Sequence, residues 1–493
     1  MTHTFLLSNT STDSFPVRRR RWGSRARSLV SAGLVAAIFG AGVFAPAASA
    51  DEAREQQYWI KDYGIDQAWK VTRGAGVTVA VIDSGVDTTH QDLSGAMAGG
   101  YDASGAGAKN GSKPLGSLPE HGTLVATMLA GRGNNSELIG KLRAQREKAQ
   151  ESAAASAKAS ASAQASSSAS SSASSSATKA AASSSSAKPS PLPKPGPGDS
   201  GIIGVAPESK LLSVSLLMGE DNPGGPDVDA QVADAVKWSV DNGAKVINIS
   251  LGSTGQDWPE SWDDAFLYAE QKDVLIVAAA GNRSGGMLQV GAPATIPGVL
   301  VVAGVDRDNK ASWDSSTQGI SIGVAAPAVD LVGGIPGGGY TTWSGTSGAA
   351  PIVAGVAALI RAKYPELSAA EVRHRIEATA KDAGPDGFDN QYGFGLIDAN
   401  AALTAELPAW EPDASDTIAD WIRVHRRAAA PTQSAAAPSA TETDLPSTHA
   451  APKPVAPSTG TNLPALLVIG TGLLILGTGA AAVVLFVQRR KNS

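Results

Sequence analysis

The chain has 493 residues, a formal net charge of −6 and 42% hydrophobic residues. This balance is typical of one sizeable globular domain with tails, and it argues against a strongly basic nucleic-acid-binding surface. Cysteine is absent, which excludes disulfides, cysteine-based metal sites and thiol chemistry.

Residues 1–50 have the features of a signal peptide. A basic region, Arg18 to Arg27, precedes the apolar run "SLVSAGLVAAIFGAGVFA", and "AASA" ends at Ala50 as a small-residue cleavage site. The alternative is a retained membrane helix, but Pro46 and the cleavage site favour removal after Ala50.

Residues 51–76 form an N-terminal extension before the first core strand. At 26 residues it is too short to hold a folded domain of its own. We expect it to wrap the globular domain that follows it and to bury Tyr58, Trp59 and Trp69.

Residues 77–405 alternate between apolar strands and helices. The expected strands are "GVTVAVIDSG", "SKLLSVSLL", "AKVINISLG", "VLIVAAAGN" and "VLVVAGVD". The expected helices are "HGTLVATMLAG", "VDAQVADAVKWSVDNG", "SWDDAFLYAEQKD" and "SGAAPIVAGVAALIRAKYP". Continuous apolar strands alternating with helices predict an α/β fold of three layers, with a mainly parallel central sheet covered by helices on both faces.

Two segments have the composition of linkers. Residues 132–200 are rich in Ala, Ser and Pro, with one short helix expected at "SELIGKLRAQREKAQ", and we predict a disordered insertion looping out of the domain. Residues 406–462, rich in Pro, Ala and Thr, are predicted to be a semi-extended stalk.

The C-terminal region predicts a membrane anchor. Residues 463–487 are uncharged and long enough to span a bilayer, and residues 488–493 form a basic tail. Because positive residues stay inside, the globular domain is expected outside the cell, on a single-pass anchor in the cell membrane. The alternative is cell-wall anchoring, since "APSTG" before the apolar span resembles a sortase signal whose usual leading Leu is Ala456.

Two polar residues stand at element ends in the first half of the domain. Asp83 follows an apolar strand, where it is either a turn residue or a carboxylate that orients an imidazole. His121 begins a helix and, of the six histidines, is the only one followed by "GTLVA".

Two further candidates lie later in the domain. Ser347 follows Gly345 at the start of a helix, whose dipole favours negative charge. Asn282 ends the strand "VLIVAAAGN", where it is either a turn residue or a donor to a developing oxyanion. In an open parallel sheet, the predicted positions of all four residues meet at one edge.

These motifs resemble the subtilisin-like serine peptidases over residues 58–405. The matching strings are "VAVIDSGVD", "HGTLVA", "GVAPESKLLSV", "VINISLGS", "VAAAGN" and "GTSGAAP". The resemblance implies an endopeptidase with the catalytic triad Asp83, His121 and Ser347, and with Asn282 in the oxyanion hole. It also implies two walls of the substrate cleft, at Ser250, Leu251 and Gly252 and at Ala279, Ala280 and Gly281. No metal and no cofactor is expected.

Within that superfamily the chain resembles the mycosins, membrane-anchored peptidases associated with type VII secretion in actinobacteria. The shared features are the start of the domain close after the signal peptide, the insertion after the His121 helix, the Pro-rich stalk and the C-terminal anchor. Two features depart from that pattern: the absence of cysteine, and Gly348, where a larger residue is usual. The expected partners are protein or peptide substrates and type VII membrane components. A general cell-surface peptidase and a structural scaffold of a secretion complex remain as alternatives.

Overall fold

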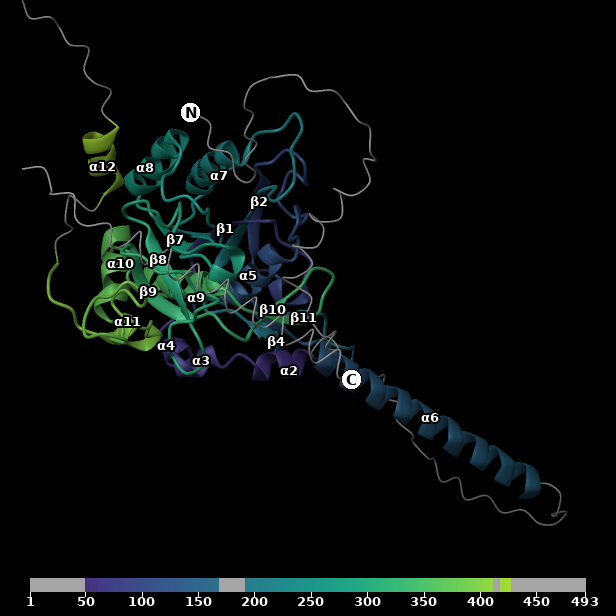
Figure 1. Ribbon diagram of the computed structural model, residues 1–493. Coiled ribbons are helices and arrows are strands. Elements are labelled where there is room, and N and C mark those ends of the chain that lie inside the picture. The colour runs from purple at the N-terminus through teal and green to yellow at the C-terminus, as the bar shows by residue number, and fades with distance from the viewer. Residues whose placement is uncertain (1–48, 168–190, 411–416, 427–493) are drawn as a thin grey trace, which may run out of the picture. The chain divides into compact units, whose positions relative to one another are not determined.

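Seven parallel strands form the central sheet of the computed structural model, which describes residues 49–167, 191–410 and 417–426 (Figure 1). The strands follow the order β2-β5-β1-β6-β7-β8-β9. Their bounds are Met97–Asp102 (β2), Lys210–Ser215 (β5), Thr78–Asp83 (β1), Val246–Ile249 (β6), Leu275–Ala279 (β7), Leu300–Val305 (β8) and Ile322–Pro327 (β9). Every neighbouring pair is parallel, so the carboxyl ends of all seven strands lie at one edge of the sheet.

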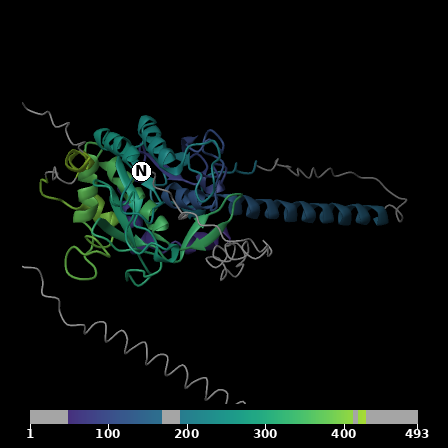
Figure 2. The same cartoon turned by 45° about the horizontal axis from the view of Figure 1, so that its top comes forward.

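Helices cover the sheet on both faces. On one face α5 (His121–Ala130) and α9 (Thr346–Lys363) pack against each other and against the strands. On the other face α7 (Val228–Asp241) and α8 (Asp263–Gln271) lie side by side, as the teal helices of Figures 1 and 2 show. This arrangement confirms the predicted α/β architecture. The sheet was predicted to be mainly parallel, and all of its seven strands are parallel.

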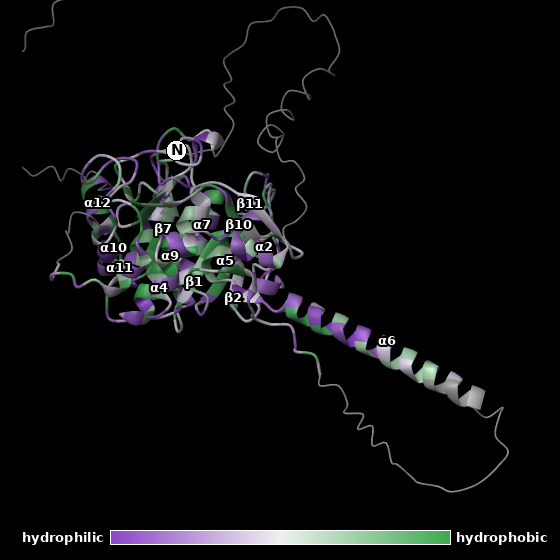
Figure 3. Ribbon diagram, turned by 90° about the horizontal axis from the view of Figure 1, so that it is seen from below, coloured by the Kyte–Doolittle hydropathy of each residue, from purple (hydrophilic) through white to green (hydrophobic). Residues whose placement is uncertain are grey.

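The core follows from the residues of these elements. The last five residues of β1 are buried, as are all residues of β6, β7 and β8, which requires apolar side chains on both faces of each strand. Helix α9 is built largely from Ala, Gly, Val and Ile and is buried almost all round. Figure 3 shows hydrophobic residues in the central strands and hydrophilic ones mainly on the outer elements.

The N-terminal extension packs against the domain through three short helices, α2 (Ala50–Glu55), α3 (Trp59–Asp62) and α4 (Ile65–Ala68). Trp59 is fully buried. Tyr58 and Trp69 are half-buried and donate hydrogen bonds to backbone carbonyls, from Tyr58 Oη to Val329 at 2.8 Å and from Trp69 Nε1 to Val205 at 2.7 Å.

The base of the insertion is closed by a two-stranded antiparallel ribbon of β3 (Arg132–Asn134) and β4 (Ser200–Ile203). Arg54 of α2 ties this base to the extension. Its guanidinium donates to the carbonyls of Gly201 at 2.7 Å, Ser200 at 3.2 Å and Gly198 at 3.3 Å. The ends of the predicted insertion are therefore part of the folded domain.

Beyond β3 the expected helix at "SELIGKLRAQREKAQ" is present, but it is longer than predicted: α6 runs from Ser136 to Ser167, into the segment predicted to be disordered. Alanine has the highest intrinsic helix propensity, and the segment "AQREKAQESAAASAKA" supplies many alanines with long polar side chains between them. Its side chains are mostly exposed, so local propensity rather than burial accounts for the helix. Residues 168–190 lie outside the described ranges.

The domain also extends further than residue 405. After α10 (Ala369–Ala378) and α11 (Ala399–Thr404), the helix α12 (Ile418–His425) packs on α8, within the segment predicted as a stalk. Ile418 is buried, the Trp421 and Trp258 rings lie 4.3 Å apart, and Arg426 donates to Asp263 at 2.8 Å. The apolar residues Ile418, Trp421 and Ile422 share one helix face, which explains the docking.

Within the described ranges, no helix is both long enough and apolar enough to span a membrane. Almost all of the predicted signal peptide and all of the predicted span at residues 463–487 lie outside those ranges.

Candidate active site

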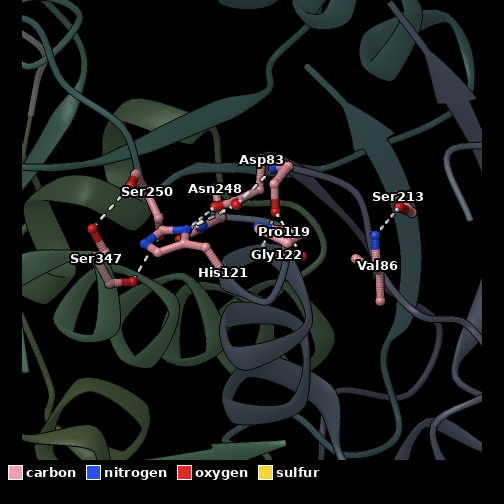
Figure 4. Close-up of polar contacts among 10 residues, drawn as sticks. Asp83, Val86, Pro119, His121, Gly122, Ser213, Asn248, Ser250 and Ser347 are labelled. Carbon is pink, nitrogen blue, oxygen red and sulfur yellow. Dashed lines mark hydrogen bonds and ion pairs between the residues drawn. The ribbon is translucent and has the colours of Figure 1, made fainter. Parts of the chain in front are cut away.

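Asp83 ends β1 at the carboxyl edge of the sheet, and its side chain is fully shielded from solvent. Its two carboxylate oxygens lie 2.8 and 2.9 Å from Nδ1 of His121 (Figure 4). The backbone N–H of Ser84 donates to the same carboxylate at 2.7 Å. The carboxylate therefore accepts a hydrogen bond from Nδ1, which fixes the proton there and leaves Nε2 as the basic nitrogen.

His121 is held by the start of α5. The N–H of Gly122 donates to the Ser84 hydroxyl at 3.0 Å, which ties this helix to the end of β1. A side chain at Gly122 would collide with the Gly85 carbonyl, so glycine permits the close approach of the two segments. The imidazole also makes an edge contact with the Trp343 ring, with centroids 5.5 Å apart.

The electrostatics of the pair favour a charged imidazole. Burial alone lowers the pKa of His121, but the charge of Asp83, its hydrogen bond to Nδ1 and the charge of Glu120 together outweigh that effect. The pKa of His121 is therefore raised above 6.5. This environment suits a base that must become an imidazolium during a reaction.

Ser347 lies in the first turn of α9 and points toward the His121 ring (Figure 4). The preceding Gly345 has a φ of 147°, and a Cβ there would lie 2.9 Å from Asn282 Nδ2, so glycine is required at this turn. In this structure the Ser347 hydroxyl donates to the carbonyl of Ser250 at 3.0 Å rather than to the imidazole.

The backbone of Ser347 is positioned by β6 and by a proline. Pro351 has no N–H, so the Ser347 carbonyl lacks the hydrogen-bond donor that the residue four positions later normally supplies in a helix. The Ser250 hydroxyl supplies the missing donor at 2.8 Å, and it accepts in turn from Asn248 Nδ2 at 2.9 Å. These bonds link the end of β6 to the start of α9.

Asn282 follows β7 and lines the same pocket as Ser347 and His121. Its Oδ1 accepts from the backbone N–H of Thr346 at 2.8 Å and from the Thr346 hydroxyl at 3.0 Å. Because a backbone N–H can only donate, these bonds identify the oxygen of the amide and leave its NH2 group as the donor for a ligand.

A second donor stands beside that amide. The backbone N–H of Ser347 belongs to the first turn of α9 and has no acceptor among the described residues. The amide of Asn282 and this N–H are suited to bind an oxyanion that forms next to the Ser347 hydroxyl.

The pocket in front of these groups has a volume of about 200 Å³. Five of the six residues predicted as cleft walls line it: Ser250, Leu251, Gly252, Ala279 and Gly281. Ala280 does not. It is fully buried, its N–H donates to Val302 at 3.0 Å, and its carbonyl accepts from Thr317 at 2.7 Å. Alternate residues of an extended segment face opposite sides, which directs Ala280 into the core and corrects its assignment.

Several contributors to the site were not predicted. Thr346 fixes the Asn282 amide, Ser84 joins the Asp83 and His121 segments, and Trp343 packs on the imidazole. Thr346 lies within the quoted motif "GTSGAAP", and Ser84 within "VAVIDSGVD", so a signal existed for both. Trp343 belongs to a separate antiparallel hairpin, β10 (Leu331–Gly334) and β11 (Tyr340–Trp343), which carried no signal of its own.

The hairpin also explains Gly348. A Cβ at this position would collide with Leu331 Cδ1 and would lie 3.2 Å from the Trp343 ring. The hairpin occupies the space that a larger residue would fill after the serine. Glycine at position 348 therefore allows the hairpin to pack closely against the start of α9.

A second buried aspartate–histidine neighbourhood lies away from the pocket. Asp92 accepts from Asn134 Nδ2 at 2.5 Å and from the Ile202 N–H at 2.8 Å, and its Oδ1 lies 3.3 Å from Tyr340 Oη. His90 does not contact the carboxylate: its Nδ1 accepts from the Asp92 N–H at 3.2 Å. Burial, the largest cause, raises the pKa of Asp92 despite these hydrogen bonds.

Among the described residues, no group of three or more His, Asp or Glu side chains is arranged to hold a metal ion.

Comparison with known proteins places the chain in a family. Residues 74–395 match the model of the subtilase family. Subtilisin DY from Bacillus licheniformis is 39% identical over 206 residues, which cover 41% of this chain and 71% of that protein.

Two solved structures are similar to the domain. Fervidolysin from Fervidobacterium pennivorans, described as a keratinolytic enzyme related to subtilisin, superposes with a TM-score of 0.51 at 26% identity, covering 72% of this chain and 48% of that one. The MycP3 protease from the type VII (ESX-3) secretion system superposes with a TM-score of 0.51 at 28% identity, covering 71% of this chain and 88% of that one.

Proposed function

The chain belongs to the subtilase family, and from that premise we propose that this subtilisin-like serine endopeptidase hydrolyses peptide bonds with Ser347 as nucleophile, His121 as general base and Asp83 as its orienting carboxylate. The observation that carries these roles is the contact of both Asp83 oxygens with His121 Nδ1, at 2.8 and 2.9 Å, in the pocket that also contains Ser347. It leaves Nε2 free of the Asp83 carboxylate.

The reaction begins when the Ser347 hydroxyl turns from the Ser250 carbonyl toward His121 Nε2. Its oxygen attacks the carbonyl carbon of the peptide bond while Nε2 takes the proton. The resulting imidazolium is stabilised by Asp83, which stays ionised. The same proton then passes to the leaving amine, and an ester joins the substrate acyl group to Ser347.

The oxyanion of the intermediate binds to the Asn282 amide and the Ser347 N–H. Such a donor typically contributes about 2.7–4 kcal/mol to the transition state. In the second half of the reaction His121 takes a proton from a water molecule whose oxygen attacks the ester carbon. The bond from that carbon to the Ser347 oxygen then breaks, and His121 returns the proton to this oxygen, which releases the acid product and restores the Ser347 hydroxyl. The protein supplies every group, so no cofactor takes part in these steps.

Digestion of a denatured protein tests this proposal. The full chain in detergent should generate internal cuts, identified as new amino termini by mass spectrometry, and the Ser347→Ala protein should generate none. Internal cuts by the Ser347→Ala protein at the wild-type rate would contradict the role of Ser347.

For the cell we propose an exported enzyme on a C-terminal membrane anchor, with the domain outside and in association with a type VII secretion system. Two observations support this setting: the uncharged span at residues 463–487 followed by a basic tail, and the likeness to the MycP3 protease over 88% of that chain. Anchoring to the cell wall through "APSTG" is the alternative attachment.

A general extracellular peptidase is the second candidate, favoured by the likeness to fervidolysin. The two settings differ in what loss of the gene does. Under the proposal, deletion abolishes export of type VII substrates, and the Ser347→Ala protein separates a catalytic from a scaffolding contribution. Normal export in the deletion strain would favour the general peptidase.

A further inference from the structure

Two glycines face the substrate pocket from opposite sides. Gly252 follows β6 and Gly281 follows β7, and both line the pocket together with Ser347. They belong to the two segments that form the walls of the cleft. Without side chains of their own, they leave an open slot between the two backbones.

The side chain of Met287 lies in that slot. A methyl group built on Gly252 would lie 3.1 Å from Met287 Cε, and one built on Gly281 would lie 2.7 Å from its Sδ. Both values are shorter than the 3.5–4.0 Å of ordinary carbon contacts. The thioether therefore reaches both walls at once, which places it between them.

The backbone of Met287 is fixed by a tight turn. The Asn282 carbonyl accepts from the N–H groups of Gly285 at 3.1 Å and Met287 at 3.2 Å. Gly286 has a φ of 87°, which the turn requires. Because Asn282 is itself held by Thr346, the turn is tied to the start of α9.

Arg283 anchors the outer side of the same loop. Its guanidinium donates to the carbonyls of Ser316 at 2.8 Å and Trp313 at 3.2 Å, and to Gln318 Oε1 at 3.2 Å. It also lies 4.3 Å over the Trp313 ring. These contacts hold the loop on both sides of Met287, whose own side-chain torsions remain to move its thioether.

We propose that Met287 is a specificity-determining residue: its thioether fills the slot that receives the side chain preceding the cut, and it restricts cleavage to positions after small residues such as alanine, glycine and serine. This inference rests on the proposed peptidase function. A methyl group enters in front of the thioether, whereas a leucine or phenylalanine side chain requires it to leave. A mismatch of one methylene in such a pocket changes kcat/KM about 10–200-fold.

The alternative to this proposal is that the flexible side chain of Met287 moves aside and admits large substrate side chains. An unbranched thioether turns easily, and Met287 is half-buried rather than enclosed. If it swings aside at little cost, it would serve as a movable wall, and large side chains would be accepted.

The test uses the full chain in detergent and two peptide p-nitroanilides that differ only in the residue before the cut, alanine or phenylalanine. Active sites are titrated with a fluorophosphonate, so that unfolded protein does not count. The wild type should favour alanine in kcat/KM by about tenfold or more. Met287→Ala should raise kcat/KM for the phenylalanine peptide and reduce or invert that preference, and Met287→Phe should strengthen it.

Leu288→Ala is the matched control, because Leu288 is the next residue on the loop, is 73% exposed and does not line the pocket. It should leave the preference unchanged. A wild type that hydrolyses the phenylalanine peptide as well as the alanine peptide, or an unchanged preference in Met287→Ala, would overturn the role of Met287 while leaving the peptidase function standing. Absence of turnover on both peptides together with absence of fluorophosphonate labelling would overturn the peptidase function itself.

Discussion

Asp83 and Asp92 are both fully shielded from solvent, and each has a histidine nearby, yet their surroundings differ in kind. Asp83 directs both oxygens to His121, whose ring borders an open pocket. The carboxylate of Asp92 is satisfied by an amide, a phenol and a backbone N–H, and His90 bonds to backbone groups instead.

Burial therefore does not by itself distinguish a carboxylate that orients a general base from one that only stabilises the fold. Both neighbourhoods hold a group with a raised pKa, His121 in one and Asp92 in the other. What distinguishes the first is an imidazole with one nitrogen left for chemistry and a serine hydroxyl in the same pocket. Substitutions in the two neighbourhoods should therefore have opposite signatures, with loss of turnover in one and loss of stability in the other.

The largest effect is expected for His121→Ala. Without its base the Ser347 hydroxyl stays protonated, and kcat should fall by roughly 10⁶-fold, as in enzymes whose triad residues act as a unit. Single-turnover assays, with the concentration of folded protein set by absorbance after size-exclusion chromatography, measure this loss. A fall of less than about a hundredfold would mean that His121 is not the principal base.

Asp83→Asn should have the next largest effect, a fall in kcat of about 10⁴-fold, because the imidazole loses the partner that fixes its proton. The pH dependence adds a second readout. Protonated His121 cannot accept the serine proton, so activity falls as pH drops through its pKa. In the wild type this acid limb should lie above 6.5, because the influence of Asp83 raises the pKa of His121.

In Asp83→Asn the opposing effect of burial remains while the charge is gone, so the acid limb should move to lower pH. The measurement is kcat/KM against pH for both proteins at constant ionic strength. If the acid limb lies at the same pH in the two proteins, the group that controls activity at low pH is not His121 paired with Asp83.

Asn282→Ala should lower kcat about 10²–10³-fold with little change in KM, because its amide binds the oxyanion more strongly than the substrate carbonyl. The substitution also frees the Thr346 N–H, so the melting temperature serves as the control for a structural effect. Unchanged turnover would reduce Asn282 to a turn residue.

Asp92→Ala should change turnover least and stability most. It leaves the Ile202 N–H without its acceptor and removes one of the two acceptors of the Asn134 amide, which keeps Tyr340 Oη. An unsatisfied buried donor costs about 1–3 kcal/mol. Urea unfolding in a Ser347→Ala background, which prevents self-digestion, measures the stability, and peptide turnover per titrated site in the otherwise wild-type chain measures the activity. A loss of turnover comparable with that of Asp83→Asn would erase the distinction between the two aspartates.

The sequence predicted the sheet and the placement of the four main site residues because both depend on local patterns. Asp83 is the last residue of one apolar strand, while Asn282 and Ser250 follow two others, and parallel strands bring such ends together. The approach of Ser347 to His121 needed the motif resemblance as well, since no local pattern relates α5 to α9.

The structure differs from the sequence-based predictions at positions whose placement depends on long-range packing or on the direction of a single side chain. Ala280 sits in a predicted wall but faces the core, because one step along an extended segment reverses the side. Helix α12 docks through three spaced apolar residues inside a segment whose overall composition indicates a linker. Met287 lies between the two walls because hydrogen bonds of Arg283 and Asn282 hold its turn. No sequence motif predicted these hydrogen bonds.

The central claim is that Ser347 is a nucleophile activated by His121, and labelling by a fluorophosphonate probe tests it most directly, because the probe forms a bond only with an activated hydroxyl. The full chain should be labelled at Ser347, located by peptide mass spectrometry, and His121→Ala should be labelled far more slowly. Ser347→Ala should not be labelled at all. Labelling of Ser347→Ala at the wild-type rate would contradict the account.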